Sequence, residues 1–199
     1  MTTTSFASAT LDRREVVATL VQRAPQCLVV SGLGSSTYDL FAAGDRDRNF
    51  YLWGAMGGSI SLGLGLALAR KDRQVVVITG DGECLMGIGS FATVGGKQPR
   101  NLSVVVLDNG HFGETGMQRS HTSLGTSLVQ VARACGIEDA IEVDEVAQAD
   151  EIARRVKAGA GPLVAQVFIG ADEPPRALPP RDGVFVKNRF RAALGLAPF

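Results

Sequence analysis

The alternation of short strand-like runs with helix-like segments is the feature that most constrains the fold of this chain. Four runs are apolar and rich in β-branched residues: Cys27–Ser31, Val75–Thr79, Val104–Leu107 and Leu163–Phe168. Continuous apolar runs of this length are typical of strands covered on both faces, as in parallel sheets. Asp139–Val143 is a weaker fifth candidate.

Helix-like segments lie between these runs. Their predicted bounds are Asp12–Arg23, Ser35–Ala43, Gly57–Arg70, Leu85–Gly95, Ser127–Cys135 and Val146–Ala158. Strands and helices that alternate through short links form right-handed βαβ units. We therefore predict an α/β fold with a doubly wound, mainly parallel sheet and helices on both faces.

The length of 199 residues fits one such domain better than two. We place the domain at residues 1–171 and a proline-rich C-terminal arm at 172–199, with a short basic helix near Val186–Leu194. An arm that lies on its own domain and an arm that reaches a partner subunit fit the sequence equally well.

Charge and composition exclude several classes of protein. Lys and Arg number 20, as do Asp and Glu, and this zero net charge argues against a nucleic-acid partner. The apolar stretch Trp53–Ala69 is too short and glycine-rich to span a membrane, and the N-terminus lacks the pattern of a signal peptide. Cys27, Cys84 and Cys135 form no CxxC pair, which favours reduced thiols over a zinc or iron–sulfur site. We expect a soluble, cytoplasmic protein.

Glycine-rich or polar links follow the predicted strands. They are Gly32–Ser36, Gly54–Gly58, Gly80–Glu83 and Asp108–Gln118. Ligands of doubly wound sheets bind beyond the carboxyl ends of the strands. These four links therefore predict a ligand site at that edge of the sheet.

Two of the links carry oxygen ligands suited to a divalent cation. Asp81 lies between Gly80 and Gly82, where glycines let the backbone approach an anion, although a helix-capping role for Asp81 is an alternative. Adjacent parallel strands would bring Asn109 beside it. A carboxylate, an amide oxygen and a backbone carbonyl suit Mg²⁺. We expect Asp81 and Asn109 to be solvent-facing loop ends.

This pair of segments resembles the motif of thiamine diphosphate enzymes, GDG followed some two dozen residues later by NN. Asp108 stands where the family usually has the first Asn of the doublet. The resemblance implies thiamine diphosphate and Mg²⁺ as cofactors. It places the metal on Asp81, Asn109 and the backbone carbonyl of His111, and the diphosphate on the N–H groups of Gly82 and Glu83.

Two further segments extend the resemblance. WGAMGGSISLGLGLALA is similar to the family's G-x-M-G segment, which gives Gly54 a hydrogen bond to the aminopyrimidine and makes Met56 the wedge that bends the cofactor. DNGHFGETGMQ, residues 108–118, resembles the sulfopyruvate and phosphonopyruvate decarboxylase group. The cofactor contacts so assigned are Gly32, Gly54, Met56, Gly80, Asp81, Gly82, Glu83, Asn109, Phe112 and Gly113.

The family needs a glutamate that binds the pyrimidine of the cofactor. This chain offers no candidate for that role, because the glutamates outside the motifs are expected to face solvent. They include Glu15, Glu142, Glu145 and Glu151. The resemblance therefore implies the β subunit of a split 2-oxo acid decarboxylase, with a pyrimidine-binding α subunit of about 170–200 residues. We expect a hetero-oligomer, or a homodimer or larger assembly when the chain is alone, and an exposed apolar rim near Met56, Leu62, Leu64 and the loop to Gln118.

Roles at the substrate end remain open. His111 and His121 are candidate acid–base groups, with surface histidines as the alternative, and Arg119 is a candidate for an anionic substrate tail. An acetolactate synthase-like carboligase subunit and a non-catalytic cofactor-binding module are the competing functions. A 2-oxoacid:ferredoxin oxidoreductase β subunit is disfavoured because its usual cysteine motifs are absent.

Overall fold

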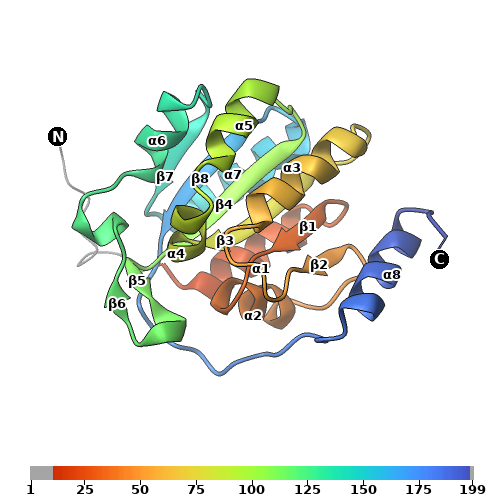
Figure 1. The fold of residues 1–199 in the computed structure, drawn as a ribbon, viewed down its shortest axis with the longest axis horizontal. Coiled ribbons are helices and arrows are strands. Elements are labelled where there is room, and N and C mark those ends of the chain that lie inside the picture. The colour runs from red at the N-terminus through yellow and green to blue at the C-terminus, as the bar shows by residue number, and fades with distance from the viewer. Residues whose placement is uncertain (1–10, 198–199) are drawn as a thin grey trace.

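A parallel six-stranded sheet forms the centre of the computed structural model, which describes residues 11–197 (Figure 1). Its strands are β1 (Leu28–Ser31), β2 (Asn49–Tyr51), β3 (Val75–Gly80), β4 (Leu102–Asp108), β7 (Ala140–Val143) and β8 (Leu163–Phe168). Their order is β2-β1-β3-β4-β8-β7, and each neighbouring pair is parallel. The expected absence of a signal peptide concerns residues 1–10, which lie outside the described residues.

Helices cover both faces of this sheet. One core contains α1 (Arg13–Arg23), α2 (Ser35–Ala42) and α7 (Val146–Ala158). The other contains α3 (Ser59–Ala69), α4 (Asp81–Met86), α5 (Ser90–Lys97) and α6 (Leu128–Ala134). The strands feed both cores because successive side chains point to opposite faces: Val76 packs in the first core and Val77 in the second. The predicted doubly wound α/β fold is confirmed.

The prediction of one helix over Leu85–Gly95 is wrong. The chain forms α4 and α5 there, separated at Gly87–Gly89. A Cβ at Gly87 would lie 2.0 Å from the carbonyl oxygen of Gly57, so two backbone segments meet where a side chain would be excluded. This approach, together with the low helix propensity of glycine, ends α4. Strand β2 was also missed, because its Asn-Phe-Tyr sequence has no apolar run.

The C-terminal arm lies on its own domain in this structure. Residues 171–182 are extended and lead to α8 (Gly183–Ala193), which packs beside β2 (Figure 1). The Trp53 indole donates to the Pro180 carbonyl at 3.0 Å. Phe190 packs edge-to-face on Phe50, with ring centroids 5.5 Å apart. Within residues 11–197, no helix has the length and apolar character needed to cross a membrane.

Two glycines of α3 give a matched stability prediction. A Cβ at Gly63 would lie 2.2 Å from Val77 Cγ2, whereas a Cβ at Gly65 would meet nothing within 4 Å. We expect Gly63→Ala to lower the free energy of unfolding by about 1–3 kcal/mol through overpacking. Gly65→Ala should raise it by up to about 1 kcal/mol through helix propensity. Urea unfolding of the two variants measures both changes, and equal effects would show that Gly63 has no special packing role.

Candidate functional site

A cavity of about 190 Å³ lies at the carboxyl edge of the sheet. We call it the inner cavity. Strands β3 and β4 end side by side there, since Gly80 is in register with Leu107 and Asp108 follows directly. Of the predicted site residues, those that line it are Met56, Gly80, Asp81, Gly82, Glu83, Asn109, His111, Phe112 and Gly113.

Two carboxylates form the electrostatic centre of this edge. Asp81 and Asp108 are both buried, which corrects the expectation that Asp81 is solvent-facing. Asp81 is the first residue of α4, so the helix draws it under the covering loop. Burial, and then the Asp108 charge, raise the pKa of Asp81. Burial likewise raises the pKa of Asp108.

Asp108 is held by three hydrogen bonds. It accepts from Gln166 Nε2 at 2.7 Å, and from the Gly110 N–H and Thr122 Oγ1 at 2.9 Å each. Thr122 Oγ1 also lies 3.4 Å from Asp81 Oδ2 and so links the two carboxylates. None of these partners carries a positive charge. The pair is therefore a buried concentration of negative charge that a cation would neutralise.

Asn109 and His111 form a tight turn beside this pair. Asn109 Oδ1 accepts the His111 backbone N–H at 3.0 Å, and His111 Nδ1 lies 2.7 Å from the Asn109 carbonyl oxygen. A carbonyl only accepts hydrogen bonds, so Nδ1 carries a proton in this contact. The turn keeps Asn109 and His111 on the inner cavity.

The segment after this turn folds over the site. Strands β5 (His111–Phe112) and β6 (Gln118–Arg119) form a small antiparallel hairpin. Phe112 packs against Gly82 so closely that a Cβ at Gly82 would lie 2.5 Å from the ring. Further along the chain, Thr122 fastens the segment to the carboxylates. The glycine of the motif is thus required for the covering loop to close on α4.

Glu83 braces the end of β1 instead of facing the cavity freely. Its Oε2 accepts from the Leu33 N–H and from Thr79 Oγ1, both at 2.9 Å. Burial raises the pKa of Glu83, and these two hydrogen bonds oppose the shift. A Cβ at Gly32 would lie 1.6 Å from Glu83 Oε2. Gly32 therefore makes room for this brace, and it does not itself line the cavity.

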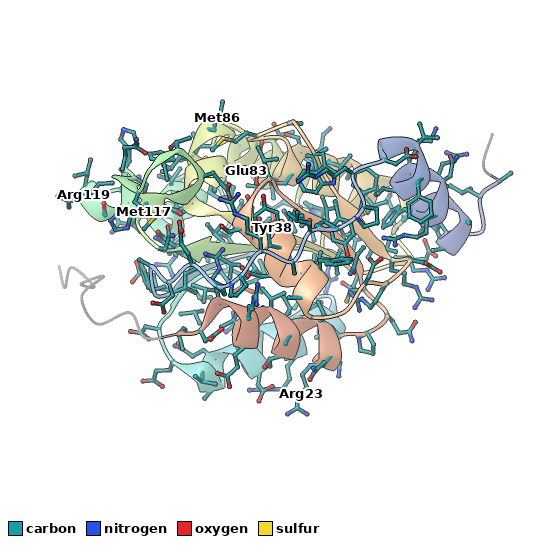
Figure 2. The ribbon with its side chains drawn as sticks, turned by 90° about the horizontal axis from the view of Figure 1, so that it is seen from below. Arg23, Tyr38, Glu83, Met86, Met117 and Arg119 are labelled. Atoms are coloured by element: carbon teal, nitrogen blue, oxygen red, sulfur yellow. The ribbon has the colours of Figure 1, made fainter. Side chains whose placement is uncertain are left out.

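A second, more open cavity of about 520 Å³ adjoins the first and is called the outer cavity. Met56 and Phe112 line both, while His121 and Met86 line only the outer one. Met56 is 41% exposed and Met86 68% exposed. Figure 2 shows Met86 projecting outward from the protein. The two histidines consequently serve different cavities.

Besides Gly32, two predicted residues lie outside both cavities. Gly54 has a positive φ of 72°, which explains the glycine, and it lines neither cavity. Arg119 lies at one end of the molecule (Figure 2), where its guanidinium is hydrogen-bonded to the Ser123 side chain and carbonyl. Substrate binding by Arg119 stays a prediction that needs this contact to open.

Sequence reasoning missed Ser35 and Ser36 at the start of α2, which also line the inner cavity. The Ser36 side chain is buried, and its hydroxyl has no hydrogen-bond partner among the described residues. The helix cap is Gly34, which supplies no side-chain hydrogen bond. Free donors at a helix N-terminus favour an anion. The signal was the link Gly32–Ser36 after β1, of which only Gly32 was selected.

The residues present fit a cation-bound diphosphate. In the described part of the chain, no group of three or more His, Cys, Asp or Glu side chains is placed to hold a metal. A cation here therefore depends on Asp81 together with amide and carbonyl oxygens, the hard donors that Mg²⁺ prefers. The unpartnered Ser36 hydroxyl is a donor for an anion among the residues that line the same cavity.

Comparison with known proteins identifies the family. Residues 34–167 match the family described as "Thiamine pyrophosphate enzyme, C-terminal TPP binding domain". This chain belongs to that family. The expected resemblance and its cofactor, thiamine diphosphate, are confirmed, and the match includes every cavity-lining motif after Gly34 and ends before the C-terminal arm.

Two of the more similar relatives are named as decarboxylases. Sulfopyruvate decarboxylase subunit beta of Methanocaldococcus jannaschii is 44% identical over 111 residues, covering 56% of this chain and 58% of that protein. Phosphonopyruvate decarboxylase of Streptomyces viridochromogenes is 50% identical over 108 residues, covering 54% of this chain and 27% of that protein. The chain thus spans less than two thirds of either relative.

A solved structure shares the fold. The thiamine diphosphate-dependent 4-hydroxybenzoylformate decarboxylase of Rhodococcus jostii superposes with a TM-score of 0.69. It is 21% identical, and the match covers 83% of this chain and 34% of that one. This similarity supports the α/β architecture alone.

Proposed function

We propose that this chain is the diphosphate-binding β subunit of a thiamine diphosphate- and Mg²⁺-dependent decarboxylase in the cytoplasm. Its substrate is a small 2-oxo acid with an anionic tail, resembling sulfopyruvate or phosphonopyruvate. The observation that carries the proposal is the pairing of buried Asp81 with Asn109 and His111 on one cavity. The names of the two relatives supply the substrate class.

The chain's own residues have three tasks in this reaction. Asp81, Asn109 and the His111 carbonyl hold Mg²⁺, while the N–H groups of Gly82 and Glu83 bind the diphosphate. Thiamine diphosphate, when bound, supplies the electron sink for the loss of CO₂. Phe112 and its loop exclude water from the inner cavity.

We assign proton transfer on the inner-cavity side to His111. Its Nδ1–H is fixed by the Asn109 carbonyl, so Nε2 is the atom that accepts or returns a proton. His121 lines the outer cavity and is the candidate on that side. Neither has a second described partner that would identify it as purely structural.

A separate α subunit completes the site. The four glutamates expected to face solvent line neither cavity. Glu15, Glu142 and Glu145 are exposed, and Glu151 is ion-paired with Arg154 and Arg155. We propose that the pyrimidine-binding glutamate comes from a separate polypeptide. The name "subunit beta" of the Methanocaldococcus relative supports this division.

We assign the surface for this α subunit to the exposed apolar side chains of α3 and α4. These are Leu62, Leu68 and Met86, and the surface at Gly65 in α3 is open. The expected rim is corrected at one position, because Leu64 is only 6% exposed and packs in the core. An exposed apolar face of this kind marks an interaction site. We propose a hetero-oligomer built on it.

Substitution of Met56 distinguishes a role in bending the cofactor from a role in binding it. In the assembled enzyme, we expect Met56→Ala to lower kcat by about 10-fold or more, because a small misplacement of reacting groups is costly. The Kd of thiamine diphosphate should change by less than about 3-fold, since the anion contacts remain. Turnover assays and calorimetry measure the two effects. Leu178→Ala, an exposed apolar change outside both cavities, is the control; an unchanged kcat would make Met56 a packing residue only.

Substrate class is tested with a panel of 2-oxo acids on the chain co-expressed with its α subunit. The proposal predicts a higher kcat/KM for sulfopyruvate or phosphonopyruvate than for pyruvate and 2-oxobutyrate. A preference for the uncharged side chains would reject the anionic-tailed substrate while leaving the cofactor site intact.

A further inference from the structure

Arg13 is the one lysine or arginine among the described residues that line the inner cavity. It is the first residue of α1, far in sequence from every motif discussed above. Only 8% of the residue is exposed. A buried guanidinium needs anionic or carbonyl partners, because it remains charged at all accessible pH values.

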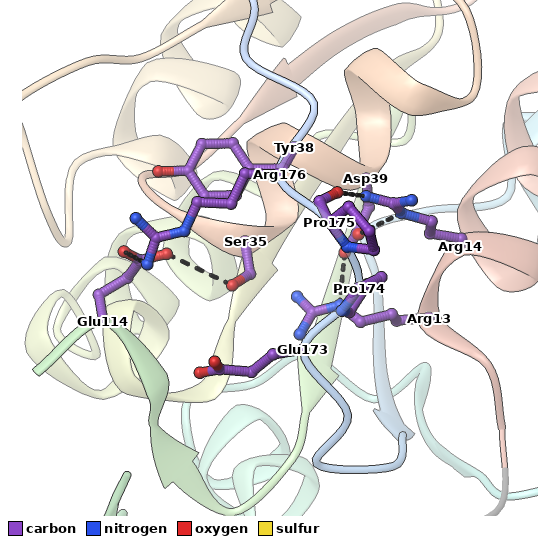
Figure 3. A pocket seen from close by; sticks show the side chains of 10 residues that line it. All are labelled: Arg13, Arg14, Ser35, Tyr38, Asp39, Glu114, Glu173, Pro174, Pro175 and Arg176. Carbon is purple, nitrogen blue, oxygen red and sulfur yellow. Dashed lines mark hydrogen bonds and ion pairs between the residues drawn. The ribbon is translucent and has the colours of Figure 1, made fainter. Parts of the chain in front are cut away.

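The protein satisfies only part of the hydrogen-bonding capacity of the Arg13 side chain. Arg13 Nε donates to Asp39 Oδ2 at 2.6 Å, whereas its two terminal nitrogens make no hydrogen bond to the described residues. Figure 3 shows the guanidinium turned toward Ser35. Two adjacent N–H donors in one plane match the oxygens of a phosphate group.

The charged side chains around this position balance: Arg13, Arg14 and Arg176 share it with Asp39, Glu114 and Glu173. Arg14 Nε lies 3.6 Å from Asp39 Oδ1, so two guanidinium groups share one carboxylate. Glu114, the acidic residue nearest to Ser35, is paired with Arg176 at 3.2 Å (Figure 3). The buried Ser36 hydroxyl without a partner lies on the same cavity. The terminal nitrogens of Arg13 and the Ser36 hydroxyl therefore favour an anion at this end.

We propose that Arg13 binds the terminal phosphate of thiamine diphosphate and makes this chain select the diphosphate over the monophosphate. The inference rests on the diphosphate site proposed above. A diphosphate bound to one divalent cation keeps a negative charge. Asp81 and Asn109 bind the cation on one side, and Arg13 with the start of α2 neutralises the remaining charge on the other.

The test compares thiamine diphosphate with thiamine monophosphate by calorimetry in Mg²⁺. It uses the isolated chain and its complex with the α subunit, each as parent, Arg13→Gln, Arg13→Lys and Arg14→Gln. We expect Arg13→Gln to weaken diphosphate binding by about 10- to 100-fold and monophosphate binding by less than about 3-fold. Glutamine keeps a donor for Asp39, and thermal unfolding verifies that each variant is folded.

Two variants separate phosphate binding from structural support. Arg13→Lys keeps the charge without the paired donors and should recover part of the preference. Arg14→Gln removes the other contact to Asp39 but lies outside the inner cavity, so it should behave like the parent. Equal losses for both ligands in Arg13→Gln, or an unchanged preference for the diphosphate, would overturn the role of Arg13. A parent that binds neither form more tightly would instead refute the diphosphate site itself, and the role of Arg13 with it.

Discussion

The purified chain is expected to release no CO₂ from any 2-oxo acid until its α subunit is added. In the proposed enzyme this chain holds the diphosphate end of the cofactor, and the α subunit supplies the glutamate that binds the pyrimidine. A positioned acid–base group alone contributes about 10²- to 10⁴-fold to a rate, so its absence should reduce turnover by at least 100-fold.

Adding the α subunit should restore turnover, with thiamine diphosphate and Mg²⁺ tightening the complex by linkage. Alone, the chain should self-associate through the face that carries Leu62, Leu68 and Met86. Light scattering and a CO₂-release assay on the same samples measure both properties. Sustained turnover by the homogeneous 199-residue chain would contradict the split-enzyme account.

Asp81→Asn should abolish Mg²⁺-dependent cofactor binding and yet stabilise the free protein. The substitution removes a cation ligand, and we expect thiamine diphosphate affinity in Mg²⁺ to fall by more than about 100-fold. It also removes one of two buried like charges beside Asp108. At neutral pH, the free energy of unfolding should rise by about 1–3 kcal/mol.

The pH dependence of this gain follows from the raised pKa of Asp81. In the folded protein its carboxyl holds a proton to higher pH than in the unfolded chain. The cost of ionising it therefore grows as pH rises and disappears in acid, where both states are protonated. Asp81→Asn should gain most in alkaline buffer and little in acid. Binding loss with increased stability excludes misfolding; unchanged binding would reject Asp81 as a ligand.

Local patterns were sufficient to predict five of the six strands and the residues that meet at the inner cavity. The β-branched runs from Val75 and Val104 became the adjacent strands β3 and β4. Parallel pairing then brings their following residues, Asp81 and Asn109, to one cavity. The residues that meet at this cavity directly follow strands. Predicting that they meet therefore requires only one piece of long-range information, the order of the strands in the sheet.

Features that depend on contacts distant in sequence were not predicted. The break after α4 depends on the backbone of Gly57 meeting Gly87. Asp81 is buried because Thr122, from the covering loop, closes over it. Arg13 reaches the site only because α1 packs against α2 and pairs with Asp39. No periodicity or composition in the sequence reports these contacts.

The carbon balance of the reconstituted enzyme tests the central claim most directly. Chain and α subunit are mixed with thiamine diphosphate, Mg²⁺ and sulfopyruvate or phosphonopyruvate, and CO₂, aldehyde and remaining 2-oxo acid are quantified together. A decarboxylase predicts equal amounts of CO₂ and aldehyde for each 2-oxo acid consumed. Two 2-oxo acids consumed per CO₂, with a new carbon–carbon bond in the product, would instead identify a carboligase and contradict the account.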